Sequence, residues 1–365
     1  MNNLIRGLEA RIEQVKQFRT PIAVGAVLFL LASATLLYFI LNDTFRRTPD
    51  AHLPDQQVAA TTTEAFLPRR LDGVMVPAGQ EARRPMAVMV ENHTDARPWS
   101  GLDQASVVFE APVEGGITRF MALFDATSTA NEIGPVRSAR PYYVDWAAGY
   151  KAAYAHVGGS PAALDLINTF ATSTLFDVNE FYNGATFWRD NRRVAPHNAY
   201  TSVELLNANI EKKNATSTMA PKSWSFQDEA TTTDRGDSGS SVSIPYGGSY
   251  NVTWKYDKEQ NRYIRQNRGS PMTTRDGKWI EAKNVIVILT DSKILDDYGR
   301  LEVRTVGSGD ATMYRDGKQY LIRWKRSPGE PMKFEGRDGA DVLLNRGTTW
   351  VEVTTDSRIY AGLGV

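Results

Sequence analysis

Residues 84–124 read RPMAVMVENHTDARPWSGLDQASVVFEAPVEGGITRFMALF. Three apolar runs in this stretch, Met86–Val90, Ser106–Ala111 and Ile117–Phe124, are short and bounded by Gly, Pro or polar residues, so they predict buried β-strands. Charged and polar side chains stand where these strands end. Because loops at strand ends carry a large share of binding and catalytic groups, the stretch predicts a sheet with a site at its edge.

The chain around this stretch predicts a first domain over residues 85–213. A fourth strand is expected at Ala153–Val157. Helices are expected at Pro141–Tyr150, from Ser160-Pro161 through Phe170, and from a capping-box pattern at Thr201 to about Lys212. Strands and helices alternate irregularly, so the fold class of this domain is α+β, or mixed α/β.

The second half of the chain predicts a mainly β domain over residues 244–356. Alternating apolar and polar residues mark its expected strands: Tyr250–Tyr256, Arg262–Gln266, Asn284–Leu289, Leu301–Val306, Ala311–Tyr314, Gln319–Trp324 and Thr348–Val353. Asp316-Gly317 is a hairpin-turn pair between two of them. Residues 214–243, rich in Ser, Thr, Asp and Gly, predict a linker or a large surface excursion.

The N-terminal region predicts a membrane attachment. Pro21–Leu41 carries no charge over about 21 residues, which matches the length needed to cross a bilayer, so residues 20–42 are expected to form one transmembrane helix. Four basic residues precede it and two follow it, namely Arg6, Arg11, Lys16, Arg19, Arg46 and Arg47. The positive-inside rule then places residues 1–19 in the cytoplasm and the body outside it, joined by a tether over residues 43–84.

Composition excludes several classes of function. The 42 basic and 42 acidic side chains balance, so bulk charge gives no case for binding nucleic acid. The sequence contains no Cys, which excludes disulfides, thiolate metal sites, a cysteine nucleophile and a lipid anchor on cysteine.

The first candidate site residues lie at the ends of the predicted strands. Glu91 and Asn92 follow Met86–Val90 and are expected to bind a ligand, with His93 beside them. Glu110 and Glu114 flank a Pro turn, and paired carboxylates are what glycoside hydrolysis requires, so both are candidate catalytic groups. The alternative is a salt-bridged hairpin in which Arg119, also a candidate ligand-binding residue, pairs with one of them.

Two further segments add cations and a histidine. Arg137 and Arg140 stand just before a predicted helix and are expected to clamp a carboxylate or phosphate; the alternative is internal pairing to Glu110, Glu114 or Asp145. His156 ends a strand before Gly-Gly and is a candidate catalytic group. Ser160 after it is interpreted as a helix N-cap, since neither a P-loop nor a Gly-x-Ser-x-Gly elbow is present.

The most polar stretch, WRDNRRVAPHN, is residues 188–198. Its Arg189, Asp190 and Asn198 are expected to bind a ligand and its His197 is a catalytic candidate, because aromatic rings beside planar polar groups are typical of sugar-binding surfaces. A solvated charged loop is the alternative. No two histidines have a His-x-x-x-His or comparable spacing, so no metal and no cofactor is expected.

These segments together resemble a known family. The runs in residues 84–124, with IGPVRSARPYYVDWA, YAHVGGSP, RVAPHNAYT, NVIVILTD, GRLEVRTVGSGDA and GTTWVEV, are similar in order to the YerB-like lipoprotein family. The resemblance spans about residues 70–355 and implies an envelope-associated bacterial protein with an N-terminal and a C-terminal domain and no assigned reaction. This chain departs from the family because it has no Cys for a lipid.

The leading functional hypothesis is a single-pass, membrane-anchored protein whose exported body binds an envelope ligand such as a cell-wall glycan in a polar Glu/Arg/His cleft. The second hypothesis is a glycan-directed hydrolase that uses Glu110 or Glu114 with His156 or His197. The third is a scaffold that binds other envelope proteins and in which substitutions in the cleft are harmless.

Overall fold

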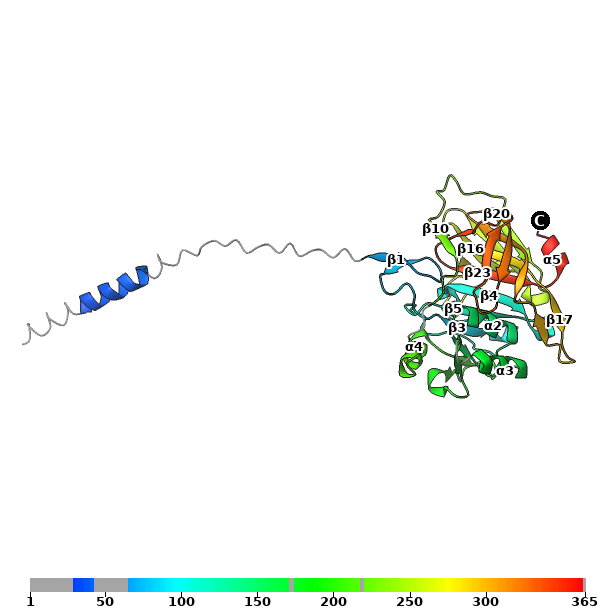
Figure 1. Ribbon diagram of the computed structural model, residues 1–365, viewed down its shortest axis with the longest axis horizontal. Coiled ribbons are helices and arrows are strands. Elements are labelled where there is room, and N and C mark those ends of the chain that lie inside the picture. The colour runs from blue at the N-terminus through cyan, green and yellow to red at the C-terminus, as the bar shows by residue number, and fades with distance from the viewer. Residues whose placement is uncertain (1–28, 43–64, 171–173, 217–219, 364–365) are drawn as a thin grey trace, which may run out of the picture. The chain divides into compact units, whose positions relative to one another are not determined.

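The computed structural model describes residues 29–42, 65–170, 174–216 and 220–363 (Figure 1). The chain divides into two compact units, Met1–Thr63 and Glu64–Val365. In the first unit, residues 29–42 are helical, while the predicted cytoplasmic segment 1–19, the first part of the predicted anchor and tether residues 43–64 lie outside the described residues. Within the described ranges, no helix combines the length and apolar character needed to cross a bilayer.

A ten-stranded mixed sheet forms the centre of the second unit and takes strands from both halves of the sequence (Figure 1). In spatial order the strands are β21 (Lys333–Gly336), β20 (Lys318–Arg326), β19 (Gly307–Arg315), β16 (Asn284–Leu289), β23 (Thr349–Thr354), β4 (Val107–Pro112), β5 (Thr118–Phe124), β3 (Met86–Glu91), β6 (Ala153–His156) and β7 (Phe176–Asn179). The halves join where β23 runs parallel to β4, with Glu352 opposite Glu110. The two predicted domains therefore share one sheet.

Both faces of this sheet are covered, which explains why its central strands are apolar throughout. Along β3, Met89 faces one core and Val88 and Val90 face the other, as alternation along a strand requires. The first core includes helices α2 (Pro141–Gly149) and α3 (Pro161–Phe170). The second includes α4 (Val203–Lys212), α5 (Ser357–Ala361) and a smaller sheet of β11 (Ser241–Ile244), β12 (Val252–Asp257), β13 (Arg262–Asn267), β14 (Ser270–Pro271) and β15 (Glu281–Ala282).

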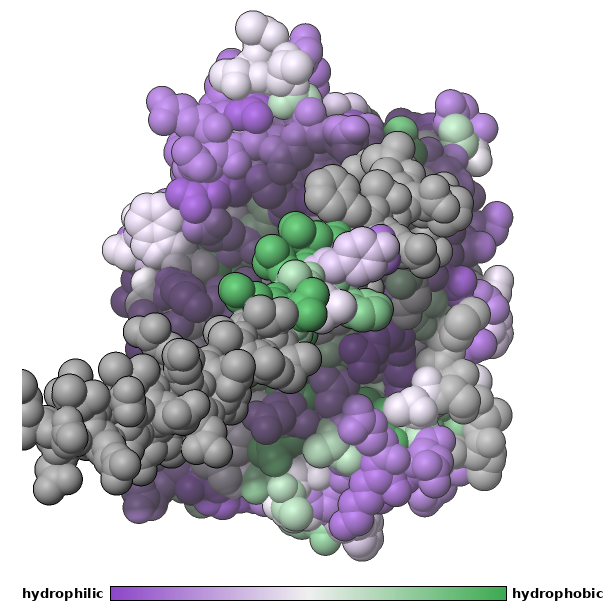
Figure 2. All heavy atoms as spheres, turned by 90° about the vertical axis from the view of Figure 1, so that its left-hand side faces the viewer, coloured by the Kyte–Doolittle hydropathy of each residue, from purple (hydrophilic) through white to green (hydrophobic). Residues whose placement is uncertain are grey.

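Short strand pairs and 3-10 turns lie outside the two larger sheets of the second unit. The pairs are β1 (Phe66–Pro68) with β2 (Met75–Pro77), β8 (Trp188–Arg189) with β9 (Ala199–Tyr200), β10 (Ser225–Gln227) with β22 (Leu343–Asn345), and β17 (Ser292–Ile294) with β18 (Leu301–Val303). Figure 2 shows the side of the molecule on which β1 lies, where apolar side chains gather within a hydrophilic surface. Phe66, Leu67 and Met75 of β1 and β2 are exposed.

The α+β first half followed by a mainly β second half is confirmed by this architecture. The Asp316-Gly317 turn joins β19 to β20, and both residues adopt the positive φ that such a turn needs. One helix start differs from the prediction: the Ser202 side chain, not Thr201, caps α4 by accepting from the Leu205 amide at 3.1 Å. Within the predicted linker 214–243, Trp224 is buried and β10 and β11 form, so this part packs on the body.

Candidate functional site

Several candidate residues gather at one edge of the ten-stranded sheet. Strands β3, β4 and β6 run in the same direction, so their carboxyl ends meet at this edge, and antiparallel β5 begins there. Glu91 ends β3 and His156 ends β6. The crevice outside the carboxyl ends of parallel strands is where open α/β sheets usually bind ligands. The sheet topology therefore agrees with the interpretation that polar residues at the ends of the predicted strands form one region.

Glu91 holds together a partly exposed group of side chains at this edge. Its carboxylate is buried and accepts from Arg137 Nε at 2.9 Å and contacts His197 Nδ1 at 2.8 Å. These three residues come from separate segments of the sequence, and the fold brings them together. Arg137 and His197 keep 27% and 17% of their side-chain surface exposed. Within the described chain, the terminal nitrogens of Arg137 and Nε2 of His197 have no hydrogen-bond partner.

His93 joins this group because a neighbouring arginine ties two loops together. Arg193 donates to the carbonyl oxygens of Ala96 at 2.9 Å and Pro98 at 2.8 Å, which fixes the 190–198 loop against the loop that follows β3. The His93 and His197 rings then stack with centroids 5.1 Å apart and 15° between their planes. We call Glu91, His93, Arg137 and His197 the histidine cluster.

Glu110 lies on the opposite face of the sheet and is fully buried. Its carboxylate accepts from Asn92 Nδ2 at 3.1 Å, Thr118 Oγ1 at 2.6 Å and Arg265 Nη2 at 2.6 Å. Asn92, predicted to bind a ligand, is likewise buried in this network. Because its oxygens are occupied by internal donors, Glu110 is placed as part of the core and does not line a cleft.

Arg265, which was not a candidate from the sequence, is the cation that donates directly to Glu110. It is buried on β13 with its guanidinium 5.4–5.7 Å from the ring centres of Trp99, Phe120 and Trp350. Strand periodicity could have indicated it, since Tyr263 and Arg265 are two residues apart and so share the inward face of β13.

Glu352 is a second buried carboxyl group, directly opposite Glu110 in the sheet. Burial raises the pKa of Glu352 well above its ordinary range, and the charge of Glu110 adds to this. Arg265 and hydrogen bonds from Trp254 Nε1 at 2.7 Å and Tyr246 OH at 2.9 Å oppose the rise in pKa. The pair of carboxyl groups therefore shares one guanidinium inside the core.

The two arginines that were predicted to clamp one anion instead pair with two different glutamates. Arg137 pairs with Glu91, and Arg140 pairs with Glu114. The pairing of Arg140 agrees with the alternative in which the arginines pair internally. Burial lowers the pKa of Arg140. Arg119 is buried and donates to the Ser138 carbonyl at 2.7 Å, with no carboxylate partner among the described residues. Arg119 therefore does not form the predicted salt-bridged hairpin.

His156 is fully buried, and each of its ring nitrogens faces an oxygen. Nδ1 lies 2.7 Å from the Gly158 carbonyl and Nε2 lies 2.8 Å from Asp177 Oδ1. With both nitrogens occupied, this ring holds the turn after β6, and it has no free atom to offer a substrate.

The remaining candidates form a polar network in which Arg189 is exposed and Asp190 is buried. Arg189 donates to Glu180 at 2.6 Å and to Asn198 at 3.0 Å. Hydrogen bonds from Arg192, with a further one from Arg275, lower the pKa of Asp190. Arg192 and Arg275 also line a polar pocket of about 290 Å³ together with Asp103, Glu132 and Asp276.

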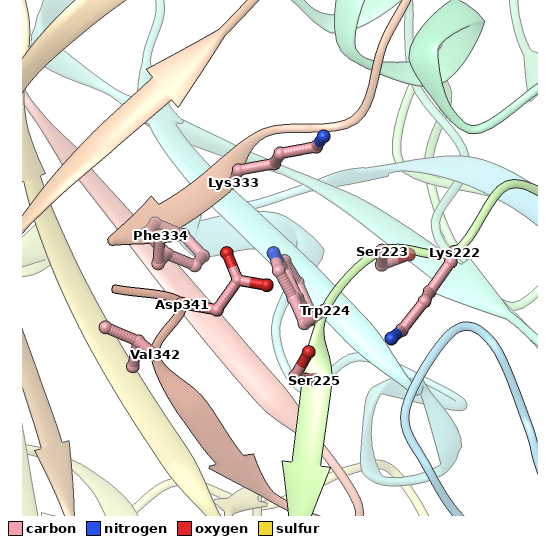
Figure 3. A pocket seen from close by; sticks show the side chains of 8 residues that line it. All are labelled: Lys222, Ser223, Trp224, Ser225, Lys333, Phe334, Asp341 and Val342. Atoms are coloured by element: carbon pink, nitrogen blue, oxygen red, sulfur yellow. The ribbon is translucent and has the colours of Figure 1, made fainter. Parts of the chain in front are cut away.

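A smaller cavity of about 180 Å³ lies elsewhere on the body, against β10 and β21 (Figure 3). Trp224 and Phe334 form its apolar wall, with ring centres 5.6 Å apart. Figure 3 labels Asp341 and Lys333 among the polar side chains that line this cavity. None of the residues that line it was a sequence candidate.

Comparison with known proteins matches this chain to a family of unknown function whose members have an N-terminal and a C-terminal domain. Residues 71–216 match the family described as "Protein of unknown function (DUF3048) N-terminal domain", and residues 242–351 match its C-terminal domain. The chain belongs to this family, and the resemblance to YerB-like proteins is confirmed.

Two relatives give the extent of the likeness. The chain is 32% identical over 320 residues to "Putative lipoprotein YerB" of Bacillus subtilis, covering 85% of this chain and 94% of that protein. The crystal structure of the YerB protein from Bacillus subtilis has a TM-score of 0.71 at 30% identity and covers 80% of this chain and 98% of that one.

Proposed function

We propose that this protein is anchored by its N-terminal apolar segment, carries its body outside the cytoplasm, and binds peptidoglycan at the histidine cluster. The relative named as a lipoprotein supports an envelope location. The 365-residue sequence holds no Cys to carry a lipid, so the uncharged Pro21–Leu41 is the segment suited to hold it at the membrane.

The main support for this binding site is the way in which Glu91 contacts Arg137 and His197. Glu91 engages Arg137 only through Nε and His197 only through Nδ1. The terminal guanidinium nitrogens and the outer imidazole nitrogen thus stay available on partly exposed side chains. A guanidinium fork binds carboxylates in a bidentate manner, and peptidoglycan carries carboxylates on its peptides beside hydroxyl groups on its sugars.

A hydrolase has less support. Glu110 is buried beneath Arg265, Glu114 pairs with Arg140, and His156 is enclosed. The acid pair that glycoside hydrolysis needs on the two sides of one bond is thus not assembled by Glu110 and Glu114.

Binding is tested with Arg137→Gln in the full chain, solubilised in detergent, by sedimentation with insoluble peptidoglycan in the presence of a chelator. We expect the variant to bind about tenfold or more weakly, because a hydrogen bond to a charged group contributes about 1.5–3 kcal/mol. Arg358→Gln is the matched control, since Arg358 is exposed on α5 and pairs only with Asp356. Equal binding by all three proteins would exclude the histidine cluster and favour a scaffold.

Topology is tested by cysteine labelling, which the cysteine-free sequence makes unambiguous. Asp165→Cys, at an exposed position of α3, is expected to react with a membrane-impermeant maleimide in intact cells. Asn3→Cys, which precedes the apolar segment, is expected to react only after the cells are lysed. The reverse pattern would place the body in the cytoplasm.

A further inference from the structure

His93, Asp95 and His197 bring three potential metal ligands to one place on the surface. Each offers one donor atom, and the three atoms lie within 4.8 Å of one another. We propose that these residues bind a divalent first-row transition metal ion, with Zn²⁺ as the ion that suits them best. The sequence had predicted no metal, because its histidines lack a recognisable spacing.

The distances fit after a small movement of side chains. Zinc binds imidazole nitrogen at about 2.0–2.1 Å in tetrahedral geometry, so its ligand atoms lie roughly 3.4 Å apart. The donor atoms, which lie within 4.8 Å of one another, therefore need to approach by up to about 1.4 Å. Asp95 can make this movement, since 70% of its side chain is exposed. The two ring centres are already 5.1 Å apart, so neither ring needs to be recruited from a distance, but one ring has to turn because the lone pairs of stacked rings do not point to a common position.

Glu91 supplies the support that metal-binding histidines usually have. A histidine ligand commonly uses its second ring nitrogen to contact a carboxylate, which fixes the tautomer and the direction of the ring. Glu91 Oε2 lies 2.8 Å from His197 Nδ1, so Nε2 is the nitrogen left for an ion. Arg137 balances the charge of Glu91, and Arg193 fixes the loop that carries His197 beside His93.

The kinds of ligand select the kind of ion. Two imidazoles with one carboxylate suit zinc and its first-row neighbours, whereas magnesium and calcium prefer sites made of oxygen. Three protein ligands also leave one tetrahedral position open to water or to an anionic group. The inference goes beyond peptidoglycan binding and is tested without any polymer.

The test is calorimetric titration of the chelator-stripped full chain in detergent, carrying a tag without histidine, with ZnCl₂ and separately with MgCl₂. We expect one Zn²⁺ per chain and no heat from Mg²⁺. His93→Ala, His197→Ala and Asp95→Asn should each weaken Zn²⁺ binding at least tenfold. Glu91→Gln should weaken it roughly 10–100-fold, as removal of a supporting carboxylate does in other sites.

Two matched controls separate this site from adventitious binding. Asp165→Asn makes the same change as Asp95→Asn at an exposed position of α3, and His52→Ala removes a histidine in the tether sequence; both should bind Zn²⁺ as the parent does. Co²⁺ should give visible absorption bands that disappear in His93→Ala and in His197→Ala. Absence of Zn²⁺ binding by the parent, or binding by His93→Ala and His197→Ala as tight as that of the parent, would overturn the proposal.

Discussion

Replacing Arg265 with Met is expected to lower the free energy of unfolding by about 3–5 kcal/mol, the usual cost of leaving one charge of a buried pair without its partner. Arg265 and Glu110 are both buried, and their atoms Nη2 and Oε2 lie 2.6 Å apart. Methionine has room among the three surrounding rings but cannot offset the charge of Glu110. Urea unfolding followed by tryptophan fluorescence measures the change.

Two companion variants identify the cause of this loss. Arg358→Met removes an exposed arginine and should unfold at the same urea concentration as the parent. Arg265→Met combined with Glu110→Gln should recover part of the stability, because the buried charge is then absent. If the double variant is no more stable than Arg265→Met alone, lost packing around the arginine explains the effect better than charge.

The histidine cluster shows how far the sequence could predict the site. Glu91 and Arg137 were recognisable because they stand beside a strand end and a helix start. Their pairing was not, since it depends on how the 133–140 segment crosses the sheet, where the Arg137 amide donates to the Met89 carbonyl. The expectation of no metal rested on the spacing of histidines in the sequence, and spacing rules detect ligands on one element, not ligands from two loops joined by Arg193.

The individual strands were easier to predict than the way in which the two halves of the chain join in one sheet. Apolar runs such as Asn284–Leu289 marked the central strands because both sides of each strand are buried. Nothing local indicated that β23 would lie beside β4, since that pairing joins residues more than 240 positions apart. The burial of Glu110 could not be predicted for this reason, because its neighbours Arg265 and Glu352 belong to the other half of the chain.

Glu352 makes the stability of this joined sheet depend on pH. In the unfolded chain a glutamate has a pKa of about 4.3, whereas burial raises the pKa of Glu352 well above this in the fold. The folded protein therefore holds this proton more tightly. Its contribution to stability is complete below the unfolded pKa and is lost as the pH rises through the folded pKa, by up to about 1.4 kcal/mol per pH unit.

Glu352→Gln is expected to remove this dependence while keeping the hydrogen bonds. Glutamine has the shape of the neutral acid: its oxygen can accept from Trp254 Nε1, and its amide can donate to Tyr246 OH, which itself donates to the Val353 carbonyl at 3.2 Å. The variant and the parent should thus have similar unfolding free energies near pH 4, below the unfolded pKa of about 4.3. At pH 8 the variant should be the more stable protein.

Unfolding measured in urea between pH 4 and pH 8 gives the difference curve, in which contributions of the titrating groups that do not interact with Glu352 cancel. Glu259→Gln, an exposed glutamate in the turn after β12, should follow the parent at every pH. A difference that rises with pH for Glu352→Gln and stays flat for Glu259→Gln means that one of the two buried carboxyl groups is neutral in the fold. Two flat differences would instead mean that Arg265 balances Glu110 and Glu352 together, because only then can both remain charged at the junction of β4 and β23.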